Sequence, residues 1–409
     1  MENSKCPLSG IRVIDLTSMA AGPVCARLLA DWGADVIKIE PFEGDFFRKF
    51  GPILGMPASE EENPLWEQAN ANKRCIALDL KSPKGEEIIH KLLAKADVLV
   101  SNYRPHALRK LKLTYEDLSK KHPKLVYAVL TGFGEKGPEA EKAGFDVIAY
   151  WARSGAMVDL VDPSGYPMNS PAGFGDHPTG SALAAGICAA LVKQQKTGRG
   201  DKVSISLLGN VLWNAAMMIA GAQKKYGYKY PRERFTPVTP LVLAYRCKDG
   251  EWIMLSILEH ERYWPAFCNS IGREDLISDD RFNTLDSVKK HSSLLIPMLE
   301  EIIAKKTRPE WVEIWQKADL AFDILRHFKD AEYDEMAWAN DNIYEHTYVN
   351  NEKSILIRTP VQFCEMGVPQ VKRAGLLGQN TKEILTELGY SPAQITEFEN
   401  KGVIKMRVA

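Results

Sequence analysis

Residues 170–207 read SPAGFGDHPTGSALAAGICAALVKQQKTGRGDKVSISL. One acid, Asp176, follows Gly173 and Gly175 and precedes an uncharged run over 182–192. The glycines let the backbone bend and approach a ligand closely, and Pro178 suits the first turn of a helix. The uncharged run predicts a helix buried on most sides, and 203–207 predicts a strand. The stretch therefore indicates a buried helix introduced by a lone acid.

Asp176 has two interpretations. An aspartate before Pro-Thr-Gly and a helix is a natural N-cap, and local rules favour that role. Alternatively, a carboxylate in a dry site is a nucleophile that forms acyl intermediates, with backbone N–H groups of the glycine-rich loop stabilising an oxyanion. His177 is not counted as a general base, because neighbours in a turn usually point apart.

Composition narrows the class of protein. The 409 residues carry a net charge of −1, with 45% hydrophobic and 26% charged residues, which is typical of a globular protein of two or three domains. The charge argues against nucleic acid or an anionic membrane as a partner. No apolar run reaches the roughly 18–20 residues of a membrane span, and the N-terminus lacks an apolar signal core, so a cytoplasmic location is expected.

Cysteine and histidine, which often bind metals in proteins, are scattered along the chain. Seven cysteines and eight histidines show no CxxC, HxxxH or HExxH spacing. A disulfide framework, a structural zinc site and any other protein-bound metal are therefore not expected.

The first third of the chain predicts an open, mostly parallel α/β sheet of Rossmann-like type. Strands are expected at 11–16, 35–40, 75–80, 96–102 and 125–134, separated by helices at 23–32, after Ser82 and at 105–112. Ligands of such sheets lie beyond the carboxyl ends of the strands.

Farther along, a helix at 210–226 precedes a smaller α+β domain. Its marks are an antiparallel hairpin around Lys248-Asp249-Gly250 and helices at 260–271, 292–305 and 308–318. We predict a large domain over 1–227, the small one over 228–330, and a return to the large domain over 331–409, with a strand at 355–360 and a helix from Thr381.

A glycine motif at 132–137, GFGEKG, follows a predicted strand and matches the dinucleotide fingerprint. However, Pro138 and a charged run follow it instead of an apolar helix, and no strand ending in an acid lies about 20 residues on. A nicotinamide enzyme is thus disfavoured, and the segment is interpreted as a loop, which would lie over a ligand.

Basic residues stand near the ends of predicted strands. Their ordinary role is a solvated face, but arginine and lysine at strand ends also capture phosphates. Placement at the boundaries between loop and strand favours anion capture modestly. The set is Lys73, Arg74, Arg104, Arg109 and Lys110.

Several long segments together resemble the class III CoA-transferases. They are LSGIRVIDLTSMAAGPVCARLLADWGADVIKIEP, NANKRCIALDLKSPKG, ADVLVSNYRPHALRKL, GFGEKGPEAEKAGFD and GDHPTGSALAAGICAALVKQQKTGRGDKVSISL. The resemblance covers nearly the whole chain and is most specific over 10–208. It is closest to the branch that acts on 2-hydroxyacyl groups such as phenyllactate and 2-hydroxyisocaproate.

The resemblance implies that Asp176 is the catalytic nucleophile, which reverses the preference for a cap. It implies an acyl-CoA donor, a carboxylic acid acceptor, no tightly bound cofactor and an interlocked homodimer. Asp146 is placed in a hydrogen-bond network near the site, with a helix cap as its alternative. The residues implied to contact coenzyme A are Ser18, Met19, Ala20, Ala21, Asn72, Lys73, Arg74, Asn102, Tyr103, Arg104 and Lys110.

Two departures restrict the substrate. The formyl-CoA enzymes carry glutamine where this chain has Ala20, and a run of glycines that it lacks, so formyl and oxalate substrates are not favoured. The related α-methylacyl-CoA racemases carry histidine where this chain has Phe145. A racemase, a transferase for carnitine, bile acid or dicarboxylate, and a non-catalytic acyl-CoA-binding protein remain as alternatives. Candidates for the acyl pocket are Met19, Phe46, Phe47, Trp151 and Met217.

Overall fold

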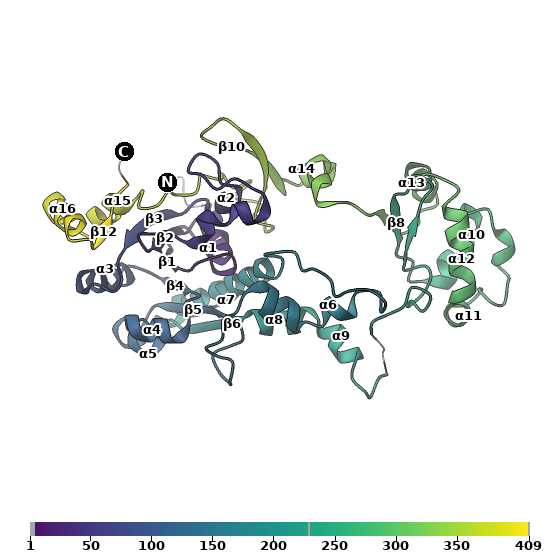
Figure 1. Ribbon diagram of the computed structural model, residues 1–409, viewed down its shortest axis with the longest axis horizontal. Helices are drawn as coiled ribbons and strands as arrows, with labels where there is room; N and C mark the ends of the chain where they lie inside the picture. The colour runs from purple at the N-terminus through teal and green to yellow at the C-terminus, as the bar shows by residue number, and fades with distance from the viewer. Residues whose placement is uncertain (1–4, 228–229, 408–409) are drawn as a thin grey trace. The chain divides into compact units, whose positions relative to one another are not determined.

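The computed structural model describes residues 5–227 and 230–407, and the chain divides into two compact units (Figure 1). Unit 1 comprises 1–155, 169–221 and 335–409, and unit 2 comprises 156–168 and 222–334. The expected start of the small domain, residue 228, lies outside the described residues. No helix in the described chain has the length and apolar character needed to cross a membrane.

Unit 1 is built on one seven-stranded sheet in the order β12-β3-β2-β1-β4-β5-β6. Neighbouring strands are parallel, except that β12 is antiparallel to β3. The expected open, mostly parallel sheet is confirmed. The strands are β1 (Arg12–Leu16), β2 (Asp35–Glu40), β3 (Arg74–Leu78), β4 (Val98–Ser101), β5 (Val126–Thr131), β6 (Lys202–Ser206) and β12 (Ile404–Lys405).

Two helices, α1 (Ala21–Asp31) and α7 (Asp176–Thr197), pack against each other and against one face of this sheet. The other face carries a continuous apolar core, in which Ile14 and Leu16 of β1 meet side chains from the remaining helices. Alternation along β1 explains the division, because successive strand residues point to opposite faces. The covering helices are α3 (Pro83–Leu93), α4 (Pro105–Leu111), α5 (Tyr115–Lys121), α15 (Thr381–Glu387) and α16 (Pro392–Asn400).

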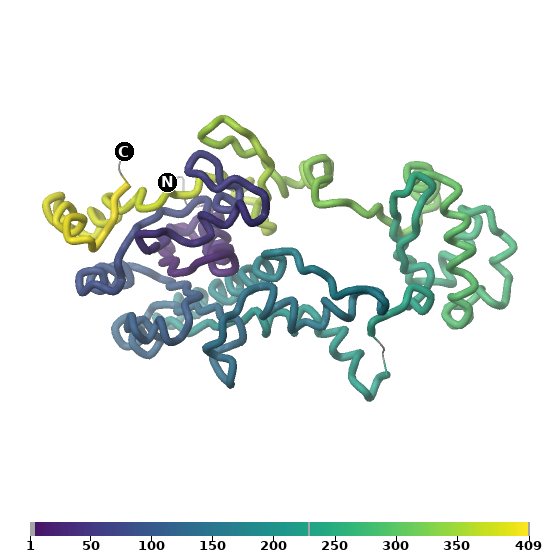
Figure 2. The backbone as a smooth tube through the Cα atoms, in the orientation of Figure 1, coloured from purple at the N-terminus to yellow at the C-terminus, as the bar shows by residue number. Residues whose placement is uncertain are grey.

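The C-terminal segment belongs to unit 1. It lies beside the N-terminal strands in Figure 2, where the yellow end of the tube meets the purple one. The segment also forms a separate two-stranded sheet of β10 (Ile343–Thr347) and β11 (Lys353–Ile357), preceded by α14 (Glu335–Ala339). The remaining short elements of unit 1 are η1 (Phe46–Lys49), η2 (Gly51–Leu54), α2 (Pro64–Asn70), a π-helical turn η3 (Asp146–Tyr150), η4 (Trp151–Arg153), α8 (Leu207–Asn214) and α9 (Ala216–Gly221).

Unit 2 folds around an antiparallel sheet and an aromatic core. The Asp-Gly hairpin is confirmed, since β7 pairs antiparallel with β8, and β9 follows on the other side. Trp264, Phe267, Trp311 and Trp315 lie in the core. The elements are β7 (Ala244–Arg246), β8 (Trp252–Leu255), β9 (Phe322–Ile324), α6 (Ala156–Asp159), α10 (His260–Ser270), η5 (Glu274–Leu276), α11 (Leu285–Lys290), α12 (Ser292–Ile303), α13 (Arg308–Lys317) and η6 (Phe328–Tyr333).

Three local expectations were wrong. The helix expected over 210–226 is two helices, α8 and α9, with a break at Ala215. Asp176 is not an N-cap: Gly175 is the N-cap residue of α7, and Asp176 is the first helical residue with no capping hydrogen bond. Helix α7 is also not buried on most sides, because Ala182, Ala185, Ala189 and Val192 form an exposed stripe along it.

Candidate active site

A cavity of about 850 Å³ lies at the carboxyl ends of β1, β4 and β5, within unit 1. Strand β1 lies between β2 and β4, so the chain connections leave it in opposite directions. Such a switch point leaves a crevice between loops, which is where open α/β sheets bind ligands. Apolar side chains form much of the wall, among them Phe46, Phe47, Phe50, Leu54, Leu65, Phe145 and Val147. The polar lining includes Ser18, Asn102, Arg104, His106, Thr131, Lys142, Asp146, Asp176 and His177.

The structure brings many of the predicted residues together here. Ser18, Met19, Ala20 and Ala21 follow β1, and Asn102, Tyr103 and Arg104 follow β4, and all of them line the cavity with Asp146 and Asp176. Of the acyl-pocket candidates, Met19, Phe46 and Phe47 line it, whereas Trp151 and Met217 are not among the lining residues of the described chain.

Two glycines set how closely α7 approaches this site. A Cβ on Gly180 would lie 2.6 Å from the carbonyl oxygen of Ala21, so α1 and α7 meet there almost backbone to backbone. A Cβ on Gly175 would lie 2.3 Å from Oδ1 of Asp146. Real Cβ atoms do not tolerate such distances. The glycines therefore allow the start of α7 to lie directly against α1 and Asp146.

The Asp176 carboxylate is half-buried and, within the described chain, accepts no hydrogen bond. Burial, and next the charge of Asp146, raise its pKa to about 7. The His177 Nδ1 contacts the Gly173 carbonyl oxygen at 2.9 Å, and no hydrogen bond joins its ring to Asp176 in the described chain. Asp176 is thus a carboxylate poised between its two protonation states, without donors that would hold it ionised.

Asp146 is buried and stands at the start of η3. Its Oδ1 accepts a hydrogen bond of 3.1 Å from the Gly175 backbone N–H, while Oδ2 has no partner in the described chain. Burial raises the Asp146 pKa, and backbone donors from Gly173 and Gly175 partly oppose that rise. Asp146 is therefore tied to the turn that precedes Asp176 by one hydrogen bond, and its place in a wider network stays a prediction.

Basic side chains form part of the cavity lining, here called the basic rim. Arg104 is exposed, lines the cavity, and pairs with no carboxylate in the portion of the chain that is described. Lys142 also lines it and pairs with Glu139 at 2.6 Å. Lys110, on α4, is exposed but is not a lining residue. Sequence reasoning missed Lys142 and His106, although both lie in segments that carried the family resemblance.

Asn72, Lys73 and Arg74 do not line the cavity. The Lys73 ammonium is buried and donates to Asp15 Oδ2 at 2.9 Å, the Pro23 carbonyl at 2.8 Å and Asn70 Oδ1 at 2.9 Å. Asn72 bonds Asp31 and the backbone of Lys372. Arg74 pairs with Asp35, Glu383 and Glu387. The side chains of all three make internal contacts, and their role in holding coenzyme A stays a prediction.

A second cavity, of about 400 Å³, adjoins the first. Tyr103 lines both cavities. Glu40, Asp79 and Lys81 supply charged groups to the second cavity at the ends of β2 and β3. No cluster of three or more potential metal ligands occurs among the described residues.

Together, the switch-point cavity, the unpaired aspartate and the basic rim define an enzyme site for a ligand with anionic and apolar parts. The family model "CoA-transferase family III" matches residues 8–381. The chain belongs to this family and is a CoA-transferase.

Two curated relatives align over almost their whole length. The (R)-2-hydroxy-4-methylpentanoate CoA-transferase of Clostridioides difficile is 41% identical over 97% of this chain and 99% of its own. The cinnamoyl-CoA:phenyllactate CoA-transferase of Clostridium sporogenes is 40% identical over 100% of this chain and 99% of its own. Among solved structures, a CaiB/BaiF family protein from Brucella suis matches with a TM-score of 0.80 and 27% identity, over 93% of this chain and 99% of its own.

The raised pKa of Asp176 predicts a pH dependence. A carboxylate that attacks an acyl-CoA must be ionised, so with a pKa of about 7 the rate of an acyl transfer to Asp176 should rise roughly tenfold per pH unit below 7 and level off above it. We expect this profile in single-turnover release of a labelled donor acid between pH 5.5 and 8.5. A flat profile across that range would contradict an ionising group near 7.

Proposed function

We propose that this enzyme moves coenzyme A from an acyl-CoA to a 2-hydroxy acid through covalent intermediates on Asp176. The observation that carries the proposal is the unpaired, half-buried Asp176 carboxylate in an apolar cavity beside the buried Asp146. The substrate class is supported by the names of the two relatives at 41% and 40% identity, both of which refer to 2-hydroxy acids.

The proposed reaction has four balanced steps. A carboxylate oxygen of Asp176 attacks the thioester carbon of the donor, which forms a mixed anhydride and releases the CoA thiolate. The thiolate attacks the aspartyl carbonyl carbon, which forms an aspartyl-CoA thioester and releases the donor acid. The acceptor carboxylate then attacks the aspartyl thioester carbon, which forms a second mixed anhydride and releases the CoA thiolate. This thiolate attacks the acceptor's acyl carbon, which forms the product acyl-CoA and regenerates the Asp176 carboxylate. No net proton is consumed.

The electrostatics suit covalent chemistry of this kind. Burial and the neighbouring Asp146 disfavour the charged form of Asp176, whereas in the anhydride and the thioester this side chain is neutral. The same environment that raises the pKa therefore favours the acylated states over the free carboxylate. Apolar walls also limit water, which would otherwise hydrolyse the intermediates.

Coenzyme A is expected to enter along the basic rim. Arg104 and Lys142 line the cavity and supply charge for phosphate groups, with Lys110 as a further candidate on α4. The acyl group is assigned to the apolar wall, where Phe46, Phe47 and Phe50 would contact an aryl or branched aliphatic side chain. A racemase is less favoured, because Phe145 offers no proton-transfer group.

We also propose a homodimer, as the family resemblance implies. Its support on this chain is apolar surface in unit 1: the exposed stripe of α7, with Trp213 at 78% and Met217 at 89% exposure on the neighbouring α8 and α9. Monomers rarely expose large contiguous apolar patches. Light scattering on the purified chain tests this, and a monomer at working concentration would contradict it.

Intact-mass analysis tests the mechanism. Incubation with an acyl-CoA donor and no acceptor should add one CoA, less one water, to the chain, and peptide mapping should place it on Asp176. Hydroxylamine should convert the adduct to an aspartyl hydroxamate. A chain that transfers CoA without any adduct at Asp176 would refute the covalent route, and deuterium exchange at the α-carbon without acceptor would indicate a racemase.

A further inference from the structure

The turn between β1 and α1 is held in an unfavourable backbone conformation. Met19 has a φ of 66°, in the left-handed region that non-glycine residues seldom occupy. Such a residue costs on the order of 1 kcal/mol or more and persists only where the surroundings fix it. Since Ser18 to Ala21 line the same cavity as Asp176, the conformation of this turn sets the shape of one wall.

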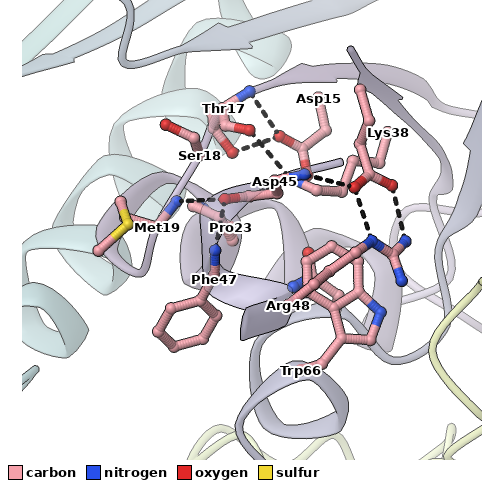
Figure 3. A network of polar contacts seen from close by, with 12 residues as sticks. Asp15, Thr17, Ser18, Met19, Pro23, Lys38, Asp45, Phe47, Arg48 and Trp66 are labelled. Carbon is pink, nitrogen blue, oxygen red and sulfur yellow. Dashed lines mark hydrogen bonds and ion pairs between the residues drawn. The ribbon is translucent and has the colours of Figure 1, made fainter. Parts of the chain in front are cut away.

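A buried ion pair forms hydrogen bonds to the turn on one side (Figure 3). Asp45 Oδ1 accepts hydrogen bonds from the backbone N–H groups of Met19, at 3.1 Å, and Phe47, at 3.0 Å. Asp45 Oδ2 pairs with Lys38 Nζ at 3.1 Å, and that ammonium donates to the Thr17 carbonyl at 2.9 Å. Lys38 is fully buried and Asp45 nearly so.

The backbone of Asp45 is itself fixed. Its N–H donates to Glu40 Oε2 at 2.9 Å, and Glu40 forms a two-bonded pair with Arg48. The Arg48 guanidinium in turn stacks on the Trp66 ring, 3.7 Å from the ring centre. The carboxylate that binds the Met19 N–H is therefore held in place by a connected series of charged groups from β2 and η1.

Asn102 forms hydrogen bonds to the turn from the other side of β1. Its Oδ1 accepts from the Ser18 N–H at 2.9 Å, and its Nδ2 donates to the Ser18 carbonyl at 2.7 Å. Both ends of the amide are therefore engaged with one residue of the turn. Asn102 follows β4 and directly precedes Tyr103 and Arg104, so it ties the two loops that diverge at the switch point.

The buried ion pair of Asp45 and Lys38 is not explained by its contribution to stability alone. Burying an ion pair gains little over well-packed apolar side chains, because desolvation offsets the attraction. These groups do fix the backbone conformation of the turn. The Thr17 carbonyl, both backbone groups of Ser18 and the Met19 N–H are each hydrogen-bonded to one of these side chains.

We propose that Asp45, paired with Lys38, and Asn102 are positioning residues that hold the Ser18–Ala21 wall of the cavity in register with Asp176 for acyl transfer. This rests on the proposed function, and it gives Asn102 a different role from the coenzyme A contact expected from the sequence.

The test uses Asn102→Ala, Asp45→Asn and the double variant of the full chain. Asp45→Asn keeps an acceptor for the Met19 N–H but turns an uncharged amide toward Lys38. Asp31→Asn is the matched control, because Asp31 forms a buried ion pair with Arg27 at 2.6 Å and does not line the cavity. The readouts are the single-turnover acylation rate of Asp176, normalised to the fraction of chains that become labelled, and the KM for acyl-CoA.

We expect each single variant to lower the acylation rate about 10- to 100-fold, as small misplacements of reacting groups do, while KM changes less than about threefold. Because both act on one turn, the double variant should lose clearly less than the product of the two single losses. Asp31→Asn should lower the melting temperature and leave the rate unchanged. Asn102 is only partly buried, so Asn102→Ala is expected to fold even where Asp45→Asn does not.

Three outcomes would overturn the positioning role: unchanged rates in both variants, independent losses that multiply in the double variant, or a KM that rises with an unchanged rate in Asn102→Ala. The last would mark Asn102 as a coenzyme A contact. A wild-type chain that transfers CoA without an Asp176 adduct would instead contradict the proposed function, and steady-state kcat of the same variants would then decide the positioning role.

Discussion

Replacing Asp176 with asparagine should reduce CoA transfer by a factor on the order of 10³ or more, while the chain still folds and binds acyl-CoA. The variant keeps the size of the side chain but removes the proposed nucleophile, and loss of a covalent nucleophile has effects of this order. The measurement is kcat with an acyl-CoA donor and a 2-hydroxy acid, beside acyl-CoA binding by calorimetry. Asp176→Ala should behave alike, which guards against deamidation of the asparagine.

The same substitution should stabilise the fold at neutral and alkaline pH. In the folded chain the Asp176 pKa is raised from its ordinary 3.8 to about 7, so the folded state retains a proton that the unfolded state releases between these values. The free energy of unfolding therefore falls as pH rises through that window, and the loss is complete above it. Asp176→Asn abolishes the loss, and we expect a gain of about 1–2 kcal/mol at pH 8, discounted for partial exposure, and almost none at pH 4.

Asp286→Asn is a suitable control, because Asp286 is an exposed first-turn aspartate of α11 in unit 2. Neither activity nor the pH dependence of stability should change there. Full activity in Asp176→Ala would remove Asp176 from the reaction. Equal stability of wild type and Asp176→Asn at pH 8 would show that the surroundings of Asp176 do not disfavour its ionised form.

The second large effect concerns Lys73. Lys73→Met should lower the free energy of unfolding by about 3–5 kcal/mol, because it leaves Asp15 as a fully buried acid without its closest cation. The charges of Lys38 and Lys73, acting against burial, hold the Asp15 pKa below its usual value. Denaturant unfolding measures the loss, and Asp15→Asn added to Lys73→Met should recover part of it.

Arg74→Ala is the matched surface variant. Arg74 forms its ion pairs at partly exposed positions, so we expect a loss of no more than about 1 kcal/mol. Comparing Lys73→Met with Arg74→Ala also tests the coenzyme A contact that the sequence predicts for Lys73. If Lys73→Met instead left stability intact and raised the KM for acyl-CoA, Lys73 would be a coenzyme A contact after all.

Much of the fold follows from local patterns. The apolar strands and their separating helices predict the parallel sheet. The helix expected after Ser82 is α3, which Ser82 caps through the Gly85 N–H, and Asp249-Gly250 marks a hairpin. The role of Asp176 depends on a single position. The N-cap position falls on Gly175, so Asp176 is the first helical residue, makes no capping hydrogen bond and lines the cavity.

The buried charges were not predictable in detail. Lys73 meets Asp15, 58 residues away, and no local pattern specifies such a partner. A signal was nevertheless present. Asp15 and Lys38 interrupt the apolar strands IRVIDL and DVIKIE, and a charge in a strand covered on both faces requires a partner. That reasoning leads to the groups that hold the turn at Met19.

The discontinuous make-up of unit 1 has a consequence for synthesis. Strand β12 completes the sheet by pairing Ile404 with Leu78, and the last part of unit 1 begins only at residue 335. A ribosome therefore releases nearly all of unit 2 before the sheet can be finished. Until then β3 is an open edge with free backbone groups, the kind of surface on which growing chains aggregate.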